Sequence, residues 1–309
     1  MKNQIEIRTA VTPEDAVRFW EELRAYHARD NFPDPKDRED LDYFLGEEYR
    51  AQIQALHDRP QNPLYYLFFI RNGQEIGFAM PVLHNDEEGK CFLMEFCVYP
   101  PFRGNGTGTA CAQTFLAWSK ERGAVYWELN CDGERRVRFW HRLGFIPNGV
   151  DEWGTPLMLI PPQEKLPITV EVLSDPKNWQ LLKLENSFLA EIGEEPLTEE
   201  RQESLRRAIS TGDITFFFAM RDCRVVGMCS VSPSFSTFSC GKVGTFDDFY
   251  VEPAFRKQGI ARKLAKAAQE WCRENGVASL TVCCAPCDEE MYQALGFDAP
   301  LGRTFSKLI

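Results

Sequence analysis

The chain carries one short motif twice, as Pro100-Pro101-Phe102-Arg103-Gly104-Asn105-Gly106-Thr107-Gly108 and as Pro253-Ala254-Phe255-Arg256-Lys257-Gln258-Gly259-Ile260-Ala261. Each copy follows a stretch that reads as a β-strand and leads through a glycine-bearing turn into an amphipathic helix. The first amides of a helix have no partner within the helix, and the helix dipole favours an anion there. Each copy therefore predicts a turn whose backbone amides bind phosphate.

The similarity between the two halves extends well beyond this turn. Equivalent residues are separated by 153 positions in three pairs, and by 152 and 150 in two more: Arg103/Arg256, Trp118/Trp271 and Gly123/Gly276, then Gly144/Gly296 and Gly77/Gly227. Such a small drift indicates short loop changes inside a duplicated unit, and a length of 309 residues suits two domains. We expect one domain at 1–162 and a second at 167–309, joined by a proline-rich, charged linker.

The order of expected elements is the same in both halves and mixes helices with strands. In the first half we expect helices starting at 13 and at 39–56, 107–122 and 134–143, and strands at 5–8, 64–71, 75–83, 90–99, 125–131 and 153–160. In the second half we expect helices at 176–189 and 198–210, starting at 260 and at 289–295, and strands at 168–173, 214–220, 225–231, 243–251, 279–284 and 304–308. The predicted fold class is α/β (mixed α+β), with two tandem domains that each have a central mixed β-sheet flanked by helices.

Composition narrows the possible partners. The net charge of −11 argues against a nucleic-acid surface, and no apolar run approaches the roughly 20 residues that a membrane span needs. The first residues lack the apolar core of a signal peptide, so we expect a cytoplasmic location. The eleven cysteines are odd in number, and most stand in apolar runs, which favours reduced thiols over a disulfide framework.

The turns fit only one of three phosphate-binding patterns. A P-loop needs a lysine after its second glycine, and neither copy has it. A dinucleotide fingerprint needs a third glycine, where Thr109 or Cys111 stands in the first copy. The remaining pattern, Arg/Gln-x-x-Gly-x-Gly/Ala after an acid-bearing strand, resembles the acetyl-CoA site of the GNAT superfamily of N-acetyltransferases. The resemblance covers both halves nearly end to end, because the hairpin glycines, the acid-x-x-Val strands and a closing Leu-Gly-Phe also repeat: Gly77 and Gly227, 95–98 and 248–251, 143–145 and 295–297.

The resemblance implies a CoA site in each half. The pyrophosphate would bind the backbone amides of the turn, and pantetheine would insert between two splayed parallel strands. The residues implied to bind acetyl-CoA are Val251, Arg256, Lys257, Gln258, Gly259, Ile260 and Ala261 in the second half, and Val98, Arg103, Gly104, Asn105, Gly106, Thr107 and Gly108 in the first.

Acetyl transfer to an amine needs a base, because an amine with a pKa near ~10.4 is protonated at pH 7. The resemblance places that base at Glu95 or Asp248, and the acid that protonates the leaving CoA thiolate at Tyr292. Asp247 is a secondary candidate for binding a cationic amine. The first half has Trp140 where the second has Tyr292, and an indole cannot act as an acid. We therefore expect catalysis in the second half, with a backbone amide near Val251 stabilising the oxyanion.

The implied function is transfer of an acetyl or related acyl group from acetyl-CoA directly to a primary amine of a small molecule or peptide. One alternative is a sensor or scaffold that binds acyl-CoA without turnover, and another is transfer through a covalent cysteine such as Cys284. No metal is expected, because Cys283, Cys284 and Cys287 lack a fourth ligand nearby, and we expect these thiols to be buried at a strand end. The acceptor and the oligomeric state stay open.

Overall fold

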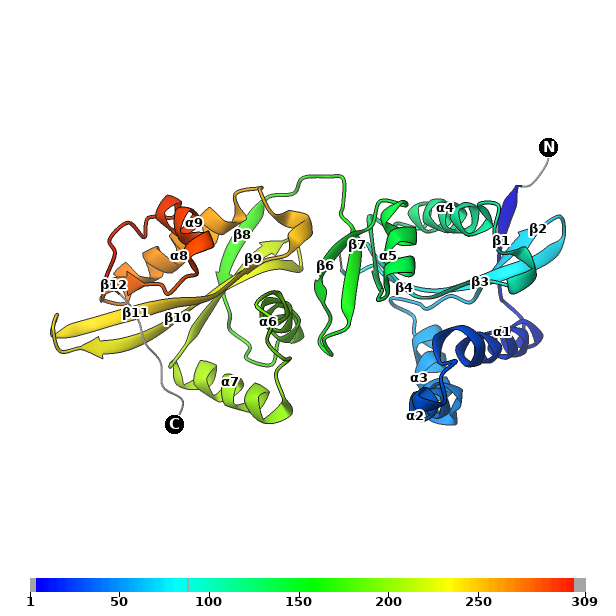
Figure 1. Ribbon diagram of the computed structural model, residues 1–309, viewed down its shortest axis with the longest axis horizontal. Helices are drawn as coiled ribbons and strands as arrows, with labels where there is room; N and C mark the ends of the chain where they lie inside the picture. The colour runs from blue at the N-terminus through cyan, green and yellow to red at the C-terminus, as the bar shows by residue number, and fades with distance from the viewer. Residues whose placement is uncertain (1–3, 88, 303–309) are drawn as a thin grey trace. The chain divides into compact units, whose positions relative to one another are not determined.

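The structure is a computed structural model that describes residues 4–87 and 89–302 (Figure 1). The chain divides into two compact units. The N-terminal unit comprises Met1–Ile146 and Met158–Gln163, and the C-terminal unit comprises Pro147–Leu157 and Glu164–Ile309. Among the described residues, no helix is both long and apolar enough to span a bilayer.

The first half of the chain builds a mixed sheet with the strand order β1-β2-β3-β4-β5-β7-β6. Its strands are β1 (Ile5–Thr9), β2 (Leu67–Arg71), β3 (Gln74–His84), β4 (Lys90–Val98), β5 (Tyr126–Asn130), β6 (Ile146–Val150) and β7 (Pro156–Ile160). Its helices are α1 (Pro13–Tyr26), the π-helical turn η1 (His27–Asn31), the short η2 (Pro35–Asp37), α2 (Arg38–Leu45), α3 (Glu47–Asp58), the short η3 (Pro100–Phe102), α4 (Thr107–Lys120) and α5 (Glu134–His141). The strands from β1 to β4 pair antiparallel, whereas β4 and β5 run parallel.

Helices cover both faces of the N-terminal sheet, which gives it two cores (Figure 1). Phe115 on α4 packs with Phe69 of β2 on one face. Phe19 on α1 packs with the neighbouring Phe68 on the other face, because successive strand side chains point in opposite directions. All four rings are fully buried, and each such burial contributes about 1.5–3 kcal/mol to folding.

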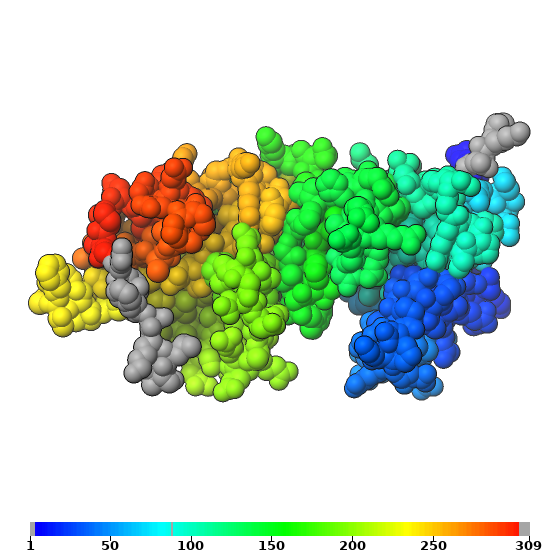
Figure 2. Space-filling model, viewed as in Figure 1, coloured from blue at the N-terminus to red at the C-terminus, as the bar shows by residue number. Residues whose placement is uncertain are grey.

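The second half repeats this arrangement with five strands in the order β12-β11-β10-β9-β8. Its strands are β8 (Ile168–Val172), β9 (Thr215–Arg221), β10 (Arg224–Ser236), β11 (Gly241–Val251) and β12 (Val277–Thr281). Its helices are α6 (Trp179–Glu191), α7 (Glu199–Thr211), the short η4 (Pro253–Phe255), α8 (Ile260–Glu274), the short η5 (Pro286–Asp288) and α9 (Glu289–Ala294). The tip of the β10–β11 hairpin extends beyond the helices of this unit (Figure 2). Among the described strand pairs of this second sheet, only β11–β12 is parallel.

Most expected elements are present, and the exceptions have physical reasons. The expected helix at 39–56 is two helices, because the chain is extended at Gly46 (φ −74°, ψ 164°) between α2 and α3. Strand β6 was not expected, since its Pro147 and Gly149 are poor strand formers. The expected strand at 304–308 lies outside the described residues.

A segment before the linker, Pro147–Leu157, groups with the C-terminal unit. Buried polar side chains, among them Asn148 and Ser187, form hydrogen bonds that attach it. Asn148 Oδ1 accepts a hydrogen bond from the Ala254 amide at 3.1 Å. Ser187 Oγ accepts from the Val150 amide at 3.0 Å and donates to the Val150 carbonyl at 3.1 Å. These bonds tie the segment to α6 and to the turn that precedes α8.

Candidate active site

Both repeated turns present uncapped helix amides. Gly106 is the N-cap of α4 and Gly259 is the N-cap of α8, and both have the left-handed backbone (φ +77° and +82°) that glycine adopts without strain. Neither N-cap has a side-chain hydrogen bond to the helix. A Cβ at either glycine would meet no atom within 4 Å, so the space above each turn is open. The turns thus have the geometry that a bound phosphate requires.

The repeated arginines of the turns are engaged within their own units. Arg103 Nε donates to the Val98 carbonyl at 2.7 Å, and its Nη1 donates to Asp30 at 3.0 Å. Arg256 Nε donates to the Val251 carbonyl at 2.8 Å. Each guanidinium therefore fixes the end of the preceding strand. The backbone amides of the turn, rather than the arginines, are therefore the groups left available for the predicted phosphate.

The other predicted turn residues divide between surface and core. Gly104, Asn105, Lys257 and Gln258 are exposed, Gly108 and Ala261 are half-buried, and Thr107 and Ile260 are buried. Asn105 and Lys257 also adopt positive φ (48° and 61°), which turns successive amides toward one side of the chain. The side chains of Thr107 and Ile260 support the fold, while the turn backbone faces outward.

The parallel strands beside each turn separate as they approach it. β4 and β5 pair only at Lys90–Phe92 with Tyr126–Glu128. In the C-terminal unit the β11–β12 pairing ends at Thr245 with Thr281. Beyond these points the described strands share no further ladder pairs. Each sheet thus opens toward Val98 or Val251, as the sequence predicts for an inserted ligand chain.

Asp248 occupies a β-bulge at the edge of this opening. Two residues of β11, Asp248 and Phe249, lie opposite one residue of β10, and Asp248 has φ +50°. A bulge re-aims the side chain, and a left-handed aspartate is strained. Ser230 Oγ donates a hydrogen bond to Asp248 Oδ2 at 2.5 Å. Burial raises the pKa of the Asp248 carboxyl, the Ser230 hydrogen bond lowers it, and the charge of Asp247 raises it. A carboxylate in this setting is a stronger base than a solvated one.

Sequence reasoning missed a third carboxylate in this place. Glu185 on α6 is 7% exposed, and its Oε2 has no hydrogen-bond partner. Burial raises the pKa of Glu185 to about 8, and the charges of Asp248 and Asp247 contribute to the same increase. The sequence did contain a signal for the burial of Glu185. The residue lies beside the apolar stripe of Leu181 and Leu184, and a residue at that position faces the sheet when the helix packs on it.

Tyr292 lies on α9 against two phenylalanine rings. Its ring centroid is 5.9 Å from that of Phe249, which follows Asp248, and 5.9 Å from that of Phe297. Burial raises the pKa of Tyr292 to about 12, with smaller contributions from Asp288 and other neighbouring groups. The phenol is therefore protonated at neutral pH.

The equivalent places in the N-terminal unit hold Glu95 and Trp140. Burial raises the pKa of Glu95 to about 8, while hydrogen bonds from Asn31 and Tyr26 lower it. Trp140 is buried and packs edge-on against Phe96 at 5.2 Å, as a core residue does. This unit has a candidate base but no tyrosine where the C-terminal unit has Tyr292.

Comparison with known proteins agrees with this geometry. The family model described as "Acetyltransferase (GNAT) family" matches residues 17–145 and 178–297, which together exceed half of the chain. This chain belongs to the GNAT acetyltransferase family. The two matches fall on the two repeats, so the predicted tandem of GNAT domains and the mixed α/β fold class are confirmed. Members of this family transfer acyl groups to amines.

Several solved GNAT structures are each similar to about half of this chain. Glucosamine-6-phosphate N-acetyltransferase from Arabidopsis thaliana is 17% identical, covers 46% of this chain and 98% of its own, and has a TM-score of 0.40. An aminoglycoside acetyltransferase from an uncultured soil metagenomic sample is 20% identical over 46% of this chain and 95% of its own, with a TM-score of 0.41. A predicted acetyltransferase with acetyl-CoA from Clostridium acetobutylicum is 15% identical over 46% and 96%, with a TM-score of 0.40. No curated protein sequence matches the chain.

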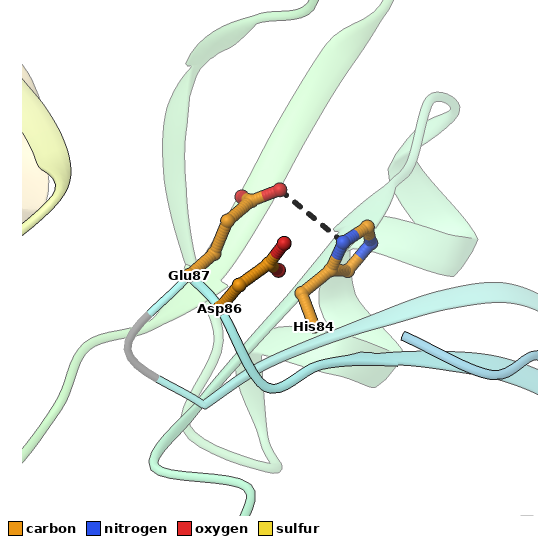
Figure 3. A group of neighbouring side chains, drawn as sticks. All are labelled: His84, Asp86 and Glu87. Atoms are coloured by element: carbon orange, nitrogen blue, oxygen red, sulfur yellow. Dashed lines mark ion pairs between the residues drawn. The ribbon is translucent and has the colours of Figure 1, made fainter. Parts of the chain in front are cut away.

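One group of possible metal ligands lies apart from both GNAT sites. His84, Asp86 and Glu87 place their ligand atoms within 4.8 Å of one another at the β3–β4 turn (Figure 3). The Glu87 carboxylate already pairs with His84 at 3.2 Å and with Lys90, and these partners lower the pKa of Glu87 to about 2 against the opposing effect of burial. A lysine ammonium in the group competes with a cation, so the cluster is best described as a hairpin ion-pair network.

The cysteine cluster of the second GNAT domain differs from expectation. Cys283, Cys284 and Cys287 are exposed, whereas we expected buried thiols at a strand end. The reason is that β12 ends at Thr281, so these residues belong to the loop that leads into η5. The apolar-run cysteines Cys97 and Cys229 are buried, as expected.

Glu185→Gln should make the GNAT fold of the C-terminal unit more stable at alkaline pH and leave it unchanged near pH 4. The folded-state pKa of Glu185 lies above its unfolded value, so the unfolded chain releases this proton first. Wild-type stability from this group falls as pH rises from about 4.3 through 8. When the folded and unfolded pKa values differ by one, the free energy of unfolding changes by ~1.4 kcal/mol, so we expect a gain on the order of 2 kcal/mol or more at pH 9.

Urea unfolding of wild type and variant at pH 4.5 and pH 9 measures this difference. Glu203→Gln, on the exposed surface of α7, is the matched control and should behave as wild type at both values. An equal effect of Glu185→Gln on stability at the two pH values would show that folding does not raise the pKa of this carboxyl.

Proposed function

We propose that this chain is an N-acetyltransferase that transfers an acetyl or related acyl group from acetyl-CoA directly to a primary amine, with catalysis in the C-terminal unit. The observation that carries the proposal is the place of Asp248. Asp248 lies on a bulge near the C-terminal end of β11, beyond the point where β11 parts from β12. The ring of the following residue, Phe249, lies 5.9 Å from that of Tyr292.

The reaction uses each of these groups once. Asp248 accepts a proton from the ammonium form of the acceptor, and the free amine attacks the thioester carbonyl to form a C–N bond. A backbone amide near Val251 stabilises the oxyanion. The C–S bond then breaks, Tyr292 donates its proton to the CoA thiolate, and the second N–H proton of the adduct restores the phenol. The products are the N-acetyl amine, CoA and one proton released from Asp248 to solvent.

The acceptor in this unit is a small molecule or peptide that carries positive charge. Asp247, Asp248 and Glu185 act on one another electrostatically, and one carboxylate suffices as a base. Asp247 favours a second cationic group on the acceptor, since opposite charges attract, and Glu185 adds a further negative charge once it ionises near pH 8. A diamine therefore suits the site better than a monoamine. The free state of the eleven cysteines supports a reducing, cytoplasmic location.

Thiol release from acetyl-CoA with a panel of amines tests the proposal. We expect turnover with 1,3-diaminopropane or longer diamines, together with a thermal shift on adding acetyl-CoA alone. A thermal shift without turnover on any amine would favour an acyl-CoA sensor instead. Radiolabel that stays on the protein after incubation with acetyl-CoA alone would favour transfer through a cysteine.

A further inference from the structure

The N-terminal unit contains the same framework as the unit in which we place catalysis. It has the open turn at Gly106 and the separation of β4 from β5. It also has a bulge in β4, where Met94 is the extra residue next to Glu95. The base is matched by Glu95, whereas Tyr292 is replaced by Trp140 and Asp247 by Met94. Whether this unit is active depends on what surrounds Glu95.

The Glu95 carboxyl is surrounded by neutral donors. Tyr26 and Asn31 hydrogen-bond to it, and Arg136 acts only through its charge. His27 Nε2 lies 3.7 Å from Glu95 Oε1, and the described chain has no lysine or arginine within ion-pair distance of this carboxyl. A buried acid that serves the fold is normally paired with a cation. Glu95 has no such cation beside it among the described residues, which favours a role in proton transfer.

His27 is oriented toward this carboxyl. Its side chain is fully buried, and Asn31 Nδ2 lies 3.1 Å from its Nδ1. Because the amide nitrogen is the donor, Nδ1 accepts and the ring proton sits on Nε2, which faces Glu95. This Nε2 has no hydrogen-bond partner. Burial lowers the pKa of His27 to about 4, so the ring is neutral and its Nε2 faces Glu95 without competing for the proton.

Local helix geometry produces this arrangement. His27 and Asn31 are the first and last residues of the π-helical turn η1, which continues α1. A π-turn widens the helix and is frequent at functional sites. The turn brings the imidazole and the amide to the same side, where both reach the β4 strand. No pattern in the sequence predicts it, because a π-turn has no composition signature.

The side chains packed around His27, next to Glu95, are aromatic rather than acidic. The His27 ring lies 5.1 Å from Phe44 and 5.9 Å from Phe32, and these two phenylalanines stack at 5.0 Å. Both are only partly buried. A further carboxylate on the same turn, Asp30, is paired with Arg29 and Arg103. The C-terminal unit, in contrast, gathers three carboxylates.

We propose that the N-terminal unit is a second acetyl-transfer site, in which Glu95 is the base, His27 is a positioning residue, and the acceptor is a primary monoamine with an apolar, aromatic body. The proposal shares its use of acetyl-CoA with the function proposed above. Glu95 takes one proton from the ammonium, the amine nitrogen bonds to the thioester carbon, and the C–S bond breaks. Because Trp140 cannot donate, the remaining ammonium proton of the adduct passes to the CoA thiolate. Glu95 then releases its proton to solvent.

Variants of the full chain separate the two sites. The probes are 2-phenylethylamine for the N-terminal site and 1,3-diaminopropane for the C-terminal site, with thiol release as the readout. Glu95→Gln should lower turnover of 2-phenylethylamine by about a hundredfold and leave turnover of the diamine within about twofold of wild type. Asp248→Asn should do the reverse. Isothermal titration should show two acetyl-CoA per chain in wild type and in both variants.

His27→Gln tests the positioning role. We expect kcat with 2-phenylethylamine to fall about tenfold, its pH dependence to shift to higher pH, and KM to change little. A purely structural histidine would change stability without moving the pH profile, so that result would remove His27 from the proposal.

Two results would overturn the second site. One is that Asp248→Asn loses turnover of both amines although it still binds two acetyl-CoA per chain. That result would leave the assignment of catalysis to the C-terminal unit intact. The other is an unchanged rate with 2-phenylethylamine in Glu95→Gln. Absence of turnover on both amines in wild type would instead refute the proposed function itself. Thermal unfolding of each variant distinguishes these outcomes from misfolding.

Discussion

Asp248→Asn should lower kcat for acetyl transfer to a diamine by about a hundredfold and leave the Kd for acetyl-CoA unchanged. The reason is that asparagine keeps the shape of the side chain but cannot accept the proton of the ammonium. The Ser230 hydroxyl still has an acceptor in the amide oxygen, so the bulge should persist. The turn that we propose binds CoA begins beyond Val251 and does not involve this side chain. Steady-state kinetics and isothermal titration measure the two quantities.

The neighbouring Asp247 provides a matched control on the same strand. Asp247→Asn removes the same charge from an exposed position, so we expect a higher KM for the diamine with kcat within a few-fold of wild type. Tyr292→Phe should lower kcat about as much as Asp248→Asn, since it removes the proton that the thiolate takes. Unchanged rates in both Asp248→Asn and Tyr292→Phe would refute these catalytic roles.

The sequence predicts most helices and strands of both units because short sequence patterns specify their turns and ends. The Asn-Gly pair at Asn72 and Gly73 forms the β2–β3 hairpin turn with positive φ at both residues, and Thr12 caps α1 directly before Pro13. Gly77 is needed because a Cβ there would lie 2.2 Å from the Cys97 carbonyl of the neighbouring strand. The turn and the cap depend on a few adjacent residues, and Gly77 is recognised because it repeats as Gly227. These features can therefore be predicted from the sequence without knowing how the helices pack on the sheets.

The surroundings of the bases were not predictable in the same way. Glu185 and His27 lie on helices, and their effect depends on how each helix docks on its sheet and on the π-turn after α1. The segment at 147–157 belongs with the C-terminal unit through buried side-chain hydrogen bonds, such as that from the Ala254 amide to Asn148. No hydrophobic periodicity in the sequence predicts these bonds. Distances across a fold are set by tertiary packing. The chemistry of a carboxylate follows from those distances and not from its motif.

Glu252→Gln should lower the free energy of unfolding of the C-terminal unit by about 3–5 kcal/mol. Glu252 is 1% exposed and stands between β11 and η4, directly before the repeated turn. Arg224 donates to both of its carboxylate oxygens at 2.9 Å, and Lys183 Nζ lies 3.2 Å from Oε1. Both cations are themselves buried. Glutamine keeps the shape but takes the shared negative charge away from two buried positive ones, which is the costly case for a buried ion pair.

Glu191→Gln is the control, because it also removes a carboxylate that pairs with an arginine next to the same turn. Its ion pair with Arg256 is about half exposed, and exposed pairs contribute about 0–1 kcal/mol. Urea unfolding of the full chain, followed by fluorescence, should show the transition of the C-terminal unit shifted in Glu252→Gln and nearly unmoved in Glu191→Gln. Because Glu252 also fixes the start of the turn, acetyl-CoA binding to this unit should weaken together with stability. Equal, small effects of the two substitutions would show that the Arg224–Glu252–Lys183 cluster does not hold the turn in place.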